Sequence, residues 1–222
     1  MTEPSGKPDH HGTWEEHYGA KPRVWSGRVN TQLAEIVAEL PGGRALDLGC
    51  GEGGDAVWLA EHGWIVVAAD VSTTALSRAR AAAGARGVGD RIEFRQHELT
   101  SSIPEGPFDL VSAQFLHSTL EMDRPAILRR AAGAVAPGGT LLIVDHGAAP
   151  PWASKMHHHE FPSPEAVVEG LALDPVQWQL IQVDCVDRAV RGPDGEESTL
   201  VDNLIRYRRN PAQGLPGSTE IL

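Results

Sequence analysis

The chain contains little of what marks secreted, membrane-spanning or nucleic-acid-binding proteins. Only two of its 222 residues are cysteine, and Cys50 and Cys185 stand far apart, which argues against a disulfide framework or a thiolate zinc site. No apolar run approaches the roughly 18 residues of a membrane span, and the polar N-terminus lacks the apolar stretch of a signal peptide. We therefore expect a cytoplasmic protein that does not bind membranes.

The chain also contains fewer basic than acidic residues. The 19 lysines and arginines stand against 30 acidic residues, which gives a net charge of −11. Because a surface of that sign repels phosphate backbones, we expect no nucleic-acid partner. What the chain does contain, 41% hydrophobic and 22% charged residues, is typical of a globular protein, and its length suits one α/β domain.

Short apolar runs alternate with helical patterns along most of the chain. The runs at 45–48, 64–70, 108–116 and 140–146 read as buried strands, and the stretch at 91–99 as another. Their alternation with helices predicts an α/β fold, a doubly wound Rossmann-like sheet of seven mostly parallel strands with helices on both faces. A Pro-Asp-Gly turn between runs at 178–190 and 198–209 predicts a C-terminal antiparallel hairpin.

The domain is expected to span residues 13–210, between a disordered tail at 1–12 and a second tail at 211–222. Within it, Asn30 or Thr31 is expected to cap a helix over 31–40, Asp55 the helix that ends at Gly63, and Ser163 a short helix after it.

The stretch LDLGCGEGGD (46–55) follows the first strand of this alternating core. Ligands of doubly wound sheets bind at such strand ends, and Gly49, Gly51 and Gly53 would let a cofactor lie against the backbone amides. Gly54 also completes the spacing of a dinucleotide fingerprint. The glycines alone therefore leave a tight turn, a nicotinamide site and another adenosine site open.

Two acidic residues narrow the choice of ligand. Asp47 lies two residues before the first glycine, where a carboxylate would repel a pyrophosphate and attract a cationic ligand. Asp70 ends the second strand, where an acid accepts hydrogen bonds from two ribose hydroxyls. Together they favour a ligand with a ribose and a positive charge but no phosphate, such as S-adenosylmethionine.

ALDLGCGEGGDAVWLAEHGWIVVAADVS (45–72) resembles the first two signature motifs of class I S-adenosylmethionine-dependent methyltransferases. HEL (97–99), FDLVSAQFLHS (108–118) and APGGTLLIVDH (136–146) resemble the motifs that follow, so the resemblance covers roughly residues 30–146. It implies S-adenosylmethionine as cofactor, with Glu98, in place of a more usual Asp, on the adenine amino group. The cofactor-binding residues it implies are Asp47, Gly49, Cys50, Gly51, Gly53, Asp70, Val71, Glu98, Leu99, Ala113 and Gln114.

The segment WEEHYGAKPRVWSGRVN (14–30) is similar to the front of small-molecule methyltransferases of the tellurite-resistance and thiopurine types. In those proteins it folds over the cofactor, which implies a lid and helix at 13–40. Trp25 would then close over the cofactor and Tyr18 over the substrate. Aromatic rings can hold a sulfonium by cation–π attraction, although ordinary packing of Trp25 onto the sheet is the alternative.

The acceptor side offers one candidate base and one candidate loop. His117 follows the fourth strand, so it is a candidate general base, although it could equally orient the loop, and a thiolate acceptor needs no base. The proline-rich segment 147–164 is expected to be a substrate loop. Its candidate substrate residues are Trp152, Met156, His157 and Phe161. No metal is expected at His157–His159, because consecutive residues cannot all turn to one ion.

These features predict an enzyme that transfers a methyl group to a small molecule. The fourth strand lacks the Asn/Asp-Pro-Pro-aromatic tetrad of adenine and glutamine methyltransferases and the Pro-Cys pair of cytosine-C5 enzymes. A non-catalytic sensor or partner protein that binds S-adenosylmethionine is an alternative. An NAD(P)-dependent oxidoreductase is another, although the chain has no Tyr-x-x-x-Lys pair. We expect a monomer or a homodimer.

Overall fold

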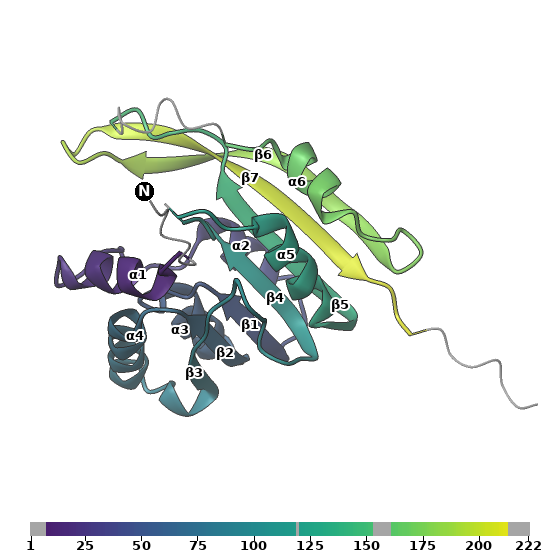
Figure 1. Ribbon diagram of the computed structural model, residues 1–222, viewed down its shortest axis with the longest axis horizontal. Coiled ribbons are helices and arrows are strands. Elements are labelled where there is room, and N and C mark those ends of the chain that lie inside the picture. Colours follow the sequence, from purple (N-terminus) through teal and green to yellow (C-terminus); the bar gives the residue numbers. More distant parts are fainter. Residues whose placement is uncertain (1–7, 119, 153–160, 213–222) are drawn as a thin grey trace, which may run out of the picture.

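The structure is a computed structural model and describes residues 8–118, 120–152 and 161–212. Helices alternate with most of the strands, and a long hairpin forms the C-terminal part of the sheet (Figure 1). The elements are α1 (His10–Gly19), α2 (Thr31–Val37), β1 (Arg44–Leu48), α3 (Gly54–Glu61), β2 (Ile65–Asp70), α4 (Thr73–Ala85), η1 (Gly89–Arg91), β3 (Ile92–Gln96), β4 (Phe108–Gln114), α5 (Arg124–Gly133), β5 (Val135–His146), α6 (Pro164–Leu171), β6 (Trp178–Arg191) and β7 (Glu197–Arg209).

In the described part of the chain, seven strands form one sheet in the order β3-β2-β1-β4-β5-β7-β6. Strands β1 to β5 pair in parallel, whereas β7 runs antiparallel to both β5 and β6. The predicted fold class is therefore confirmed, including the C-terminal hairpin. Because the chain leaves β1 first toward β2 and later resumes at β4, the switch point of the sheet lies between β1 and β4, where ligands of such folds bind.

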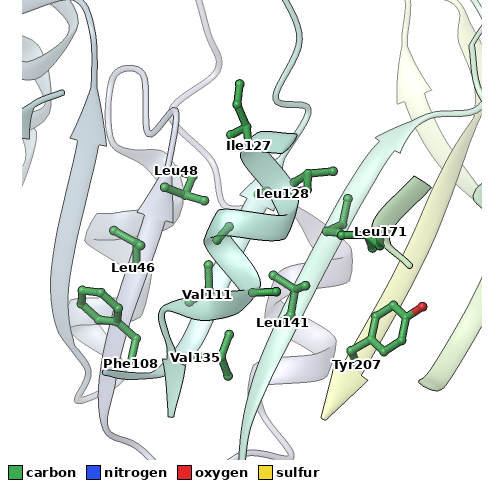
Figure 2. Close-up of a cluster of buried hydrophobic side chains, with 14 of the residues drawn as sticks. Leu46, Leu48, Phe108, Val111, Ile127, Leu128, Val135, Leu141, Leu171 and Tyr207 are labelled. Atoms are coloured by element: carbon green, nitrogen blue, oxygen red, sulfur yellow. The ribbon is translucent and has the colours of Figure 1, made fainter. Parts of the chain in front are cut away.

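Alternate residues of the strands face two separate cores, one on each side of the sheet. On one side, Leu46 and Val111 pack with Ile127 and Leu128 of α5, which lies across the strands in Figure 2. On the other side, strand residues such as Leu110 pack against α2, α3 and α4. Two-sided burial explains why these strands read as continuous apolar runs in the sequence.

The N-terminal boundary of the domain was predicted wrongly. Helix α1 begins at His10, inside the segment expected to be a disordered tail, because the Asp9 carboxylate accepts a hydrogen bond from the Gly12 N–H at 2.8 Å and caps it. Helix α2 also ends at Val37 rather than at residue 40.

Two of the three predicted helix caps are confirmed. Asn30 caps α2 and Ser163 caps α6 through their side-chain oxygens. The prediction for Asp55 was wrong, because α3 begins at Gly54 after Gly53, whose φ is +82°. Asp55 instead accepts a hydrogen bond from the Asn30 N–H at 2.7 Å, and this bond ties the start of α2 to α3.

None of the helices in the described segments is long and apolar enough to cross a bilayer.

Candidate active site

The glycine loop, residues 49–54, connects β1 to α3 at the switch point of the sheet. The Ala69 carbonyl of β2 accepts hydrogen bonds from the N–H groups of Gly49 (2.8 Å) and Cys50 (3.0 Å). Gly51 has a φ of +52°, and a Cβ there would lie 2.9 Å from the Tyr18 hydroxyl. A Cβ on Gly49 would lie 2.8 Å from Leu116 Cδ1. The positive φ values of Gly49 and Gly51, together with these neighbouring side chains, therefore favour glycine in this loop even without a ligand.

Two carboxylates are buried where β1 and β2 end at this loop. Asp70 accepts hydrogen bonds from the N–H groups of Gly51 (2.8 Å) and Ser72 (2.9 Å). Asp47 is 2% exposed, and its buried Oδ2 accepts no hydrogen bond from the described residues. Burial, reinforced by the charges of Asp55 and Asp70, raises the pKa of Asp47 well above its usual range. A cationic group placed beside Asp47 would relieve this unfavourable burial.

The same acidic environment extends to the first turn of α3. Burial raises the pKa of Asp55 to about 6, against the hydrogen bond from Asn30. Burial and the neighbouring carboxylates Asp70 and Asp47 also raise the pKa of the Cys50 thiol. Cys50 therefore stays protonated near neutral pH, and its sulfur is not a reactive thiolate.

The N-terminal strap, residues 8–30, covers the glycine loop. Glu52 of the loop accepts hydrogen bonds from the N–H groups of Val24 (3.1 Å) and Trp25 (2.9 Å) and pairs with Arg78 at 2.8 Å. These bonds outweigh burial and hold the pKa of Glu52 below its ordinary value. Trp25 Nε1 donates to the Tyr18 hydroxyl at 3.0 Å. The strap thus places Tyr18 against the glycine loop, while Trp25 remains 52% exposed.

A second carboxylate fastens the strap to α4. Glu15 accepts hydrogen bonds from the hydroxyls of Ser72 and Thr73 and from the Thr74 N–H at the start of that helix. Burial acts to raise the pKa of Glu15, but these bonds outweigh it and lower the pKa to about 2. Neither Glu15 nor Glu52 was predicted from the sequence, because their partners lie 57 and 27 residues away.

The residues predicted around the adenine lie at the ends of β2 and β3. The Val71 carbonyl accepts a hydrogen bond from Gln96 Nε2 at 3.2 Å. Glu98 accepts hydrogen bonds from the N–H (3.0 Å) and hydroxyl (2.8 Å) of Thr100, so its carboxylate already caps a turn. Leu99 is buried in the core. The role of Glu98 on the adenine therefore stays a prediction, and one of its oxygens already binds Thr100.

Strand β4 ends beside β1 with the two residues predicted near the methyl group. Ala113 is fully buried. Gln114 donates from Nε2 to the Ser112 hydroxyl at 2.9 Å, while its buried Oε1 finds no donor among the described residues.

The acceptor-end cluster consists of Phe115, His117, His146 and Phe161, beyond the ends of β4 and β5. The rings of Phe115 and His146 stack with centroids 4.4 Å apart, and His117 lies nearly parallel to His146 at 5.9 Å. Phe161 meets both histidines edge-on, at 6.4 and 6.0 Å. Burial lowers the pKa of His146. The structure therefore brings two predicted residues, His117 and Phe161, together and adds Phe115 and His146 to them.

Asp145 lies behind this cluster and was not singled out in the sequence. It is fully buried at the end of β5, forms an ion pair with Arg124, and has Oδ1 3.5 Å from His117 Nε2. Burial raises the pKa of Asp145, and Arg124 offsets part of that rise. The sequence did contain a signal for this residue, because Asp145 lies near the end of an apolar strand, as Asp47 and Asp70 do.

The remaining predicted substrate residues are not brought to this cluster by the described structure. Trp152 is 42% exposed and lies beside Gly192 at the turn between β6 and β7. Met156 and His157, with the rest of the His157–His159 run, lie outside the described residues. Among residues 8–118, 120–152 and 161–212, no group of three or more His, Cys, Asp or Glu is placed to hold a metal ion.

Several known methyltransferases are similar to this chain. Residues 45–139 match the profile of a methyltransferase domain. The methyltransferase GfsG of Streptomyces halstedii is 34% identical over 140 residues, which cover 61% of this chain and 50% of GfsG. Thiocyanate methyltransferase 1 of Arabidopsis thaliana is 30% identical over 150 residues, 64% of this chain and 66% of that protein.

A solved structure from work on the conversion of a disulfide bond into a thioacetal group during echinomycin biosynthesis is 28% identical. It covers 91% of this chain and 94% of its own, with a TM-score of 0.68. The chain belongs to the class I S-adenosylmethionine-dependent methyltransferases. It spans about half the length of GfsG and about two thirds of thiocyanate methyltransferase 1.

S-adenosylmethionine is the cofactor that this family implies. The described residues fit it in two ways. The Asp70 carboxylate ends β2 against the Gly51 N–H of the glycine loop, and the buried Asp47 Oδ2 and Gln114 Oε1, which accept no hydrogen bond from the described residues, are acceptors suited to a cationic, amino-bearing ligand.

Proposed function

We propose that the protein transfers a methyl group from S-adenosylmethionine to a small-molecule acceptor. The observation that carries this proposal is the buried, incompletely satisfied Asp47 carboxylate at the glycine loop, next to strand β4, which leads to His117. Negative charge at that place favours a sulfonium over a pyrophosphate. S-adenosylmethionine brings an activated methyl group, so the protein has mainly to align the acceptor and exclude water.

The chain's own residues divide between two tasks. Asp70 binds the ribose hydroxyls, Glu98 and Leu99 hold the adenine, and the loop from Gly49 to Gly53 lies along the methionine part. Tyr18 and Trp25 close the pocket, since the strap already lies over Gly51. The cofactor-binding residues proposed are Trp25, Asp47, Gly49, Cys50, Gly51, Gly53, Asp70, Val71, Glu98, Leu99, Ala113 and Gln114, and the substrate-binding residues Tyr18, Met156, His157 and Phe161, whereas Trp152 lies beside the β6–β7 turn and is not among them.

His117 acts as the general base for an acceptor that carries a proton, such as a thiol or a phenol. It follows β4 and stands among aromatic rings that can hold an apolar acceptor. An acceptor that is already ionised needs no base, and thiocyanate, after which one relative is named, is of that kind. The net charge of −11 favours a small molecule over nucleic acid, and the two scattered cysteines favour a reducing compartment such as the cytoplasm.

The proposal is tested first by binding. Melting temperature is measured with S-adenosylhomocysteine and, separately, with NADH. A rise with the first and none with the second is expected, whereas a rise with NADH alone would support an oxidoreductase.

Activity is then measured as homocysteine released in a coupled assay with S-adenosylmethionine and a panel of thiols, phenols, amines, thiocyanate and chalcogen oxyanions. Binding without turnover of any acceptor would support a non-catalytic S-adenosylmethionine-binding protein instead.

A further inference from the structure

We propose that Arg124 and Asp145 form a clamp that positions His117 for proton transfer, an inference that rests on the methyl-transfer function proposed above. Neither residue is placed to touch the acceptor. Both act through His117 and the turn that carries it, and they are therefore positioning residues.

The turn at Phe115–His117 is held in an unusual conformation. Phe115 has a φ of +51°, which a side chain other than glycine rarely adopts. Its N–H donates to the Val144 carbonyl of β5 at 2.7 Å, and the His117 N–H donates to the Phe115 carbonyl at 2.9 Å. Such a conformation persists only where its surroundings hold it, and it is found most often at functional sites.

Arg124 connects this turn to the end of β5. Its Nε donates to the Leu116 carbonyl at 2.9 Å, while its Nη2 pairs with Asp145. The guanidinium therefore uses two edges of its planar fork at once, which a lysine cannot do. Arg124 is itself fixed as the first residue of α5, where Asp123 caps the helix through the Ala126 N–H at 2.9 Å.

Asp145 completes the clamp by facing the imidazole directly. The same oxygen, Oδ1, faces both Arg124 and His117 Nε2, the latter at 3.5 Å. Nδ1 is then the ring nitrogen that does not face Asp145 and that can take a proton from an acceptor. Arg124 favours the ionised form of Asp145 against its burial, and an ionised Asp145 would stabilise the imidazolium that forms.

The other titratable groups around His117 come from three further places. His146 of β5 stacks near it. Arg188 of β6 lies over the Phe115 ring and is neutralised by Asp202 of β7. His10 of α1 reaches the hydroxyl of Ser118, the next residue, at 3.4 Å. Asp145 is the carboxylate that pairs with His117, so its effect can be separated from that of Asp202.

The first test needs no acceptor. The Hε1 resonance of His117, assigned by its loss in His117→Gln, is titrated by NMR in the wild type and in Asp145→Asn. The midpoint is expected to fall by about one pH unit, because a carboxylate within 4–6 Å favours the charged imidazole. Asp202→Asn is the matched control and should move His146 but not His117. An unchanged His117 midpoint in Asp145→Asn, or an equal shift in both variants, overturns the proposal.

The second test separates position from charge. Arg124→Lys keeps the positive charge but cannot bridge Leu116 and Asp145. The kcat, measured with thiophenol or phenol as the acceptor, should therefore fall about 10- to 100-fold. The KM for S-adenosylmethionine should stay within twofold, and Arg129→Lys on the exposed side of α5 should change neither. Asp145→Asn keeps an acceptor oxygen and should retain more activity than Asp145→Leu. Full activity in Arg124→Lys overturns the clamp.

Failure of the clamp and failure of the proposed function give different results. A wild type that binds S-adenosylhomocysteine but methylates nothing contradicts the proposed function, while the NMR titration still decides whether Asp145 acts on His117. Retained S-adenosylhomocysteine binding in each variant shows that the fold survives the substitution.

Discussion

The two ends of the candidate site are built in different ways. The cofactor end comes from one continuous stretch, residues 46–55, together with Asp70 at the end of the neighbouring strand. The acceptor end is assembled from β4, α5, β5 and the segment at Phe161, which the fold alone brings together. A ligand held by backbone and strand ends leaves a local motif in the sequence, whereas a site formed by distant side chains does not.

The electrostatics of the two ends differ as well. At the cofactor end, the buried Asp47 and the half-buried Asp55 have no cationic side chain among their hydrogen-bond or ion-pair partners in the described residues, and their pKa values are raised. At the acceptor end, the buried carboxylates Asp145 and Asp202 each pair with an arginine. We therefore expect the methyl donor to be selected by charge and the acceptor by shape and apolar contact. The following substitutions test this division.

The largest effect is expected at the acceptor end. His117→Gln removes the general base, so kcat for a thiol or phenol acceptor should fall about 100- to 10,000-fold at neutral pH. The Kd for S-adenosylhomocysteine, measured by calorimetry, should stay within twofold. His62→Gln, on the surface at the end of α3, is the control. An equal loss of cofactor affinity in His117→Gln would break the separation of the two ends.

At the cofactor end, the expected effect is a loss of cofactor affinity. Asp70→Ala removes the acceptor for two ribose hydroxyls, so the Kd for S-adenosylhomocysteine should rise about 100- to 1,000-fold, at about 1.5–2 kcal/mol for each hydrogen bond to a charged group. Asp109→Ala is a matched control, because Asp109 also accepts a backbone N–H, from Arg44, but at the opposite end of the sheet. Unchanged affinity in Asp70→Ala would remove the basis of the cofactor assignment.

Charge at the cofactor end should also reduce stability. The pKa of Asp55 is about 6 in the folded protein against an ordinary 3.8, so the folded state resists ionisation and the free energy of unfolding should fall as pH rises from about 4 to about 6. Asp55→Asn keeps an oxygen for the Asn30 N–H and should be more stable than the wild type at pH 7.5, by up to about 3 kcal/mol.

Urea unfolding at pH 4 and pH 7.5 measures this difference, which should nearly vanish at the lower pH. Asp90→Asn, an exposed site in η1, should change stability at neither pH. A destabilised Asp55→Asn at pH 7.5 would show that the negative charge of Asp55 is compensated in the folded protein.

The smallest effect is expected in the strap. Glu52→Gln removes the charge of this side chain. The ion pair to Arg78 is lost and the hydrogen bonds from Val24 and Trp25 are weakened, so the attachment of the strap should lose about 1–2 kcal/mol. Hydrogen exchange of the amides at 18–25 should become about tenfold faster. Glu61→Gln, whose partner Arg86 is exposed, is the control. If these amides exchange no faster in Glu52→Gln, contacts other than those of Glu52 hold the strap in place.

Much of the fold could be predicted because it depends on local pattern. Strands buried on both faces left continuous apolar runs, and Asn30 and Ser163 lie where caps belong. Helix α1 was missed because its fixing contact, from Glu15 to the start of α4, joins residues far apart in sequence. Asp55 resembled a cap, but the positive φ of Gly53 moved the helix start and freed Asp55 for Asn30.

The glycine loop has an evolutionary consequence. A side chain on Gly53 would meet Ala79 Cβ at 2.7 Å, and one on Gly51 would meet Tyr18. Selection for folding alone would therefore preserve these glycines in a descendant that had lost its cofactor. No hydrogen-bond donor among the described residues binds Asp47 Oδ2, so Asp47 would be the first of these residues to be replaced. In a distant relative, the acid at the position of Asp47 is better evidence of a working site than the glycines beside it.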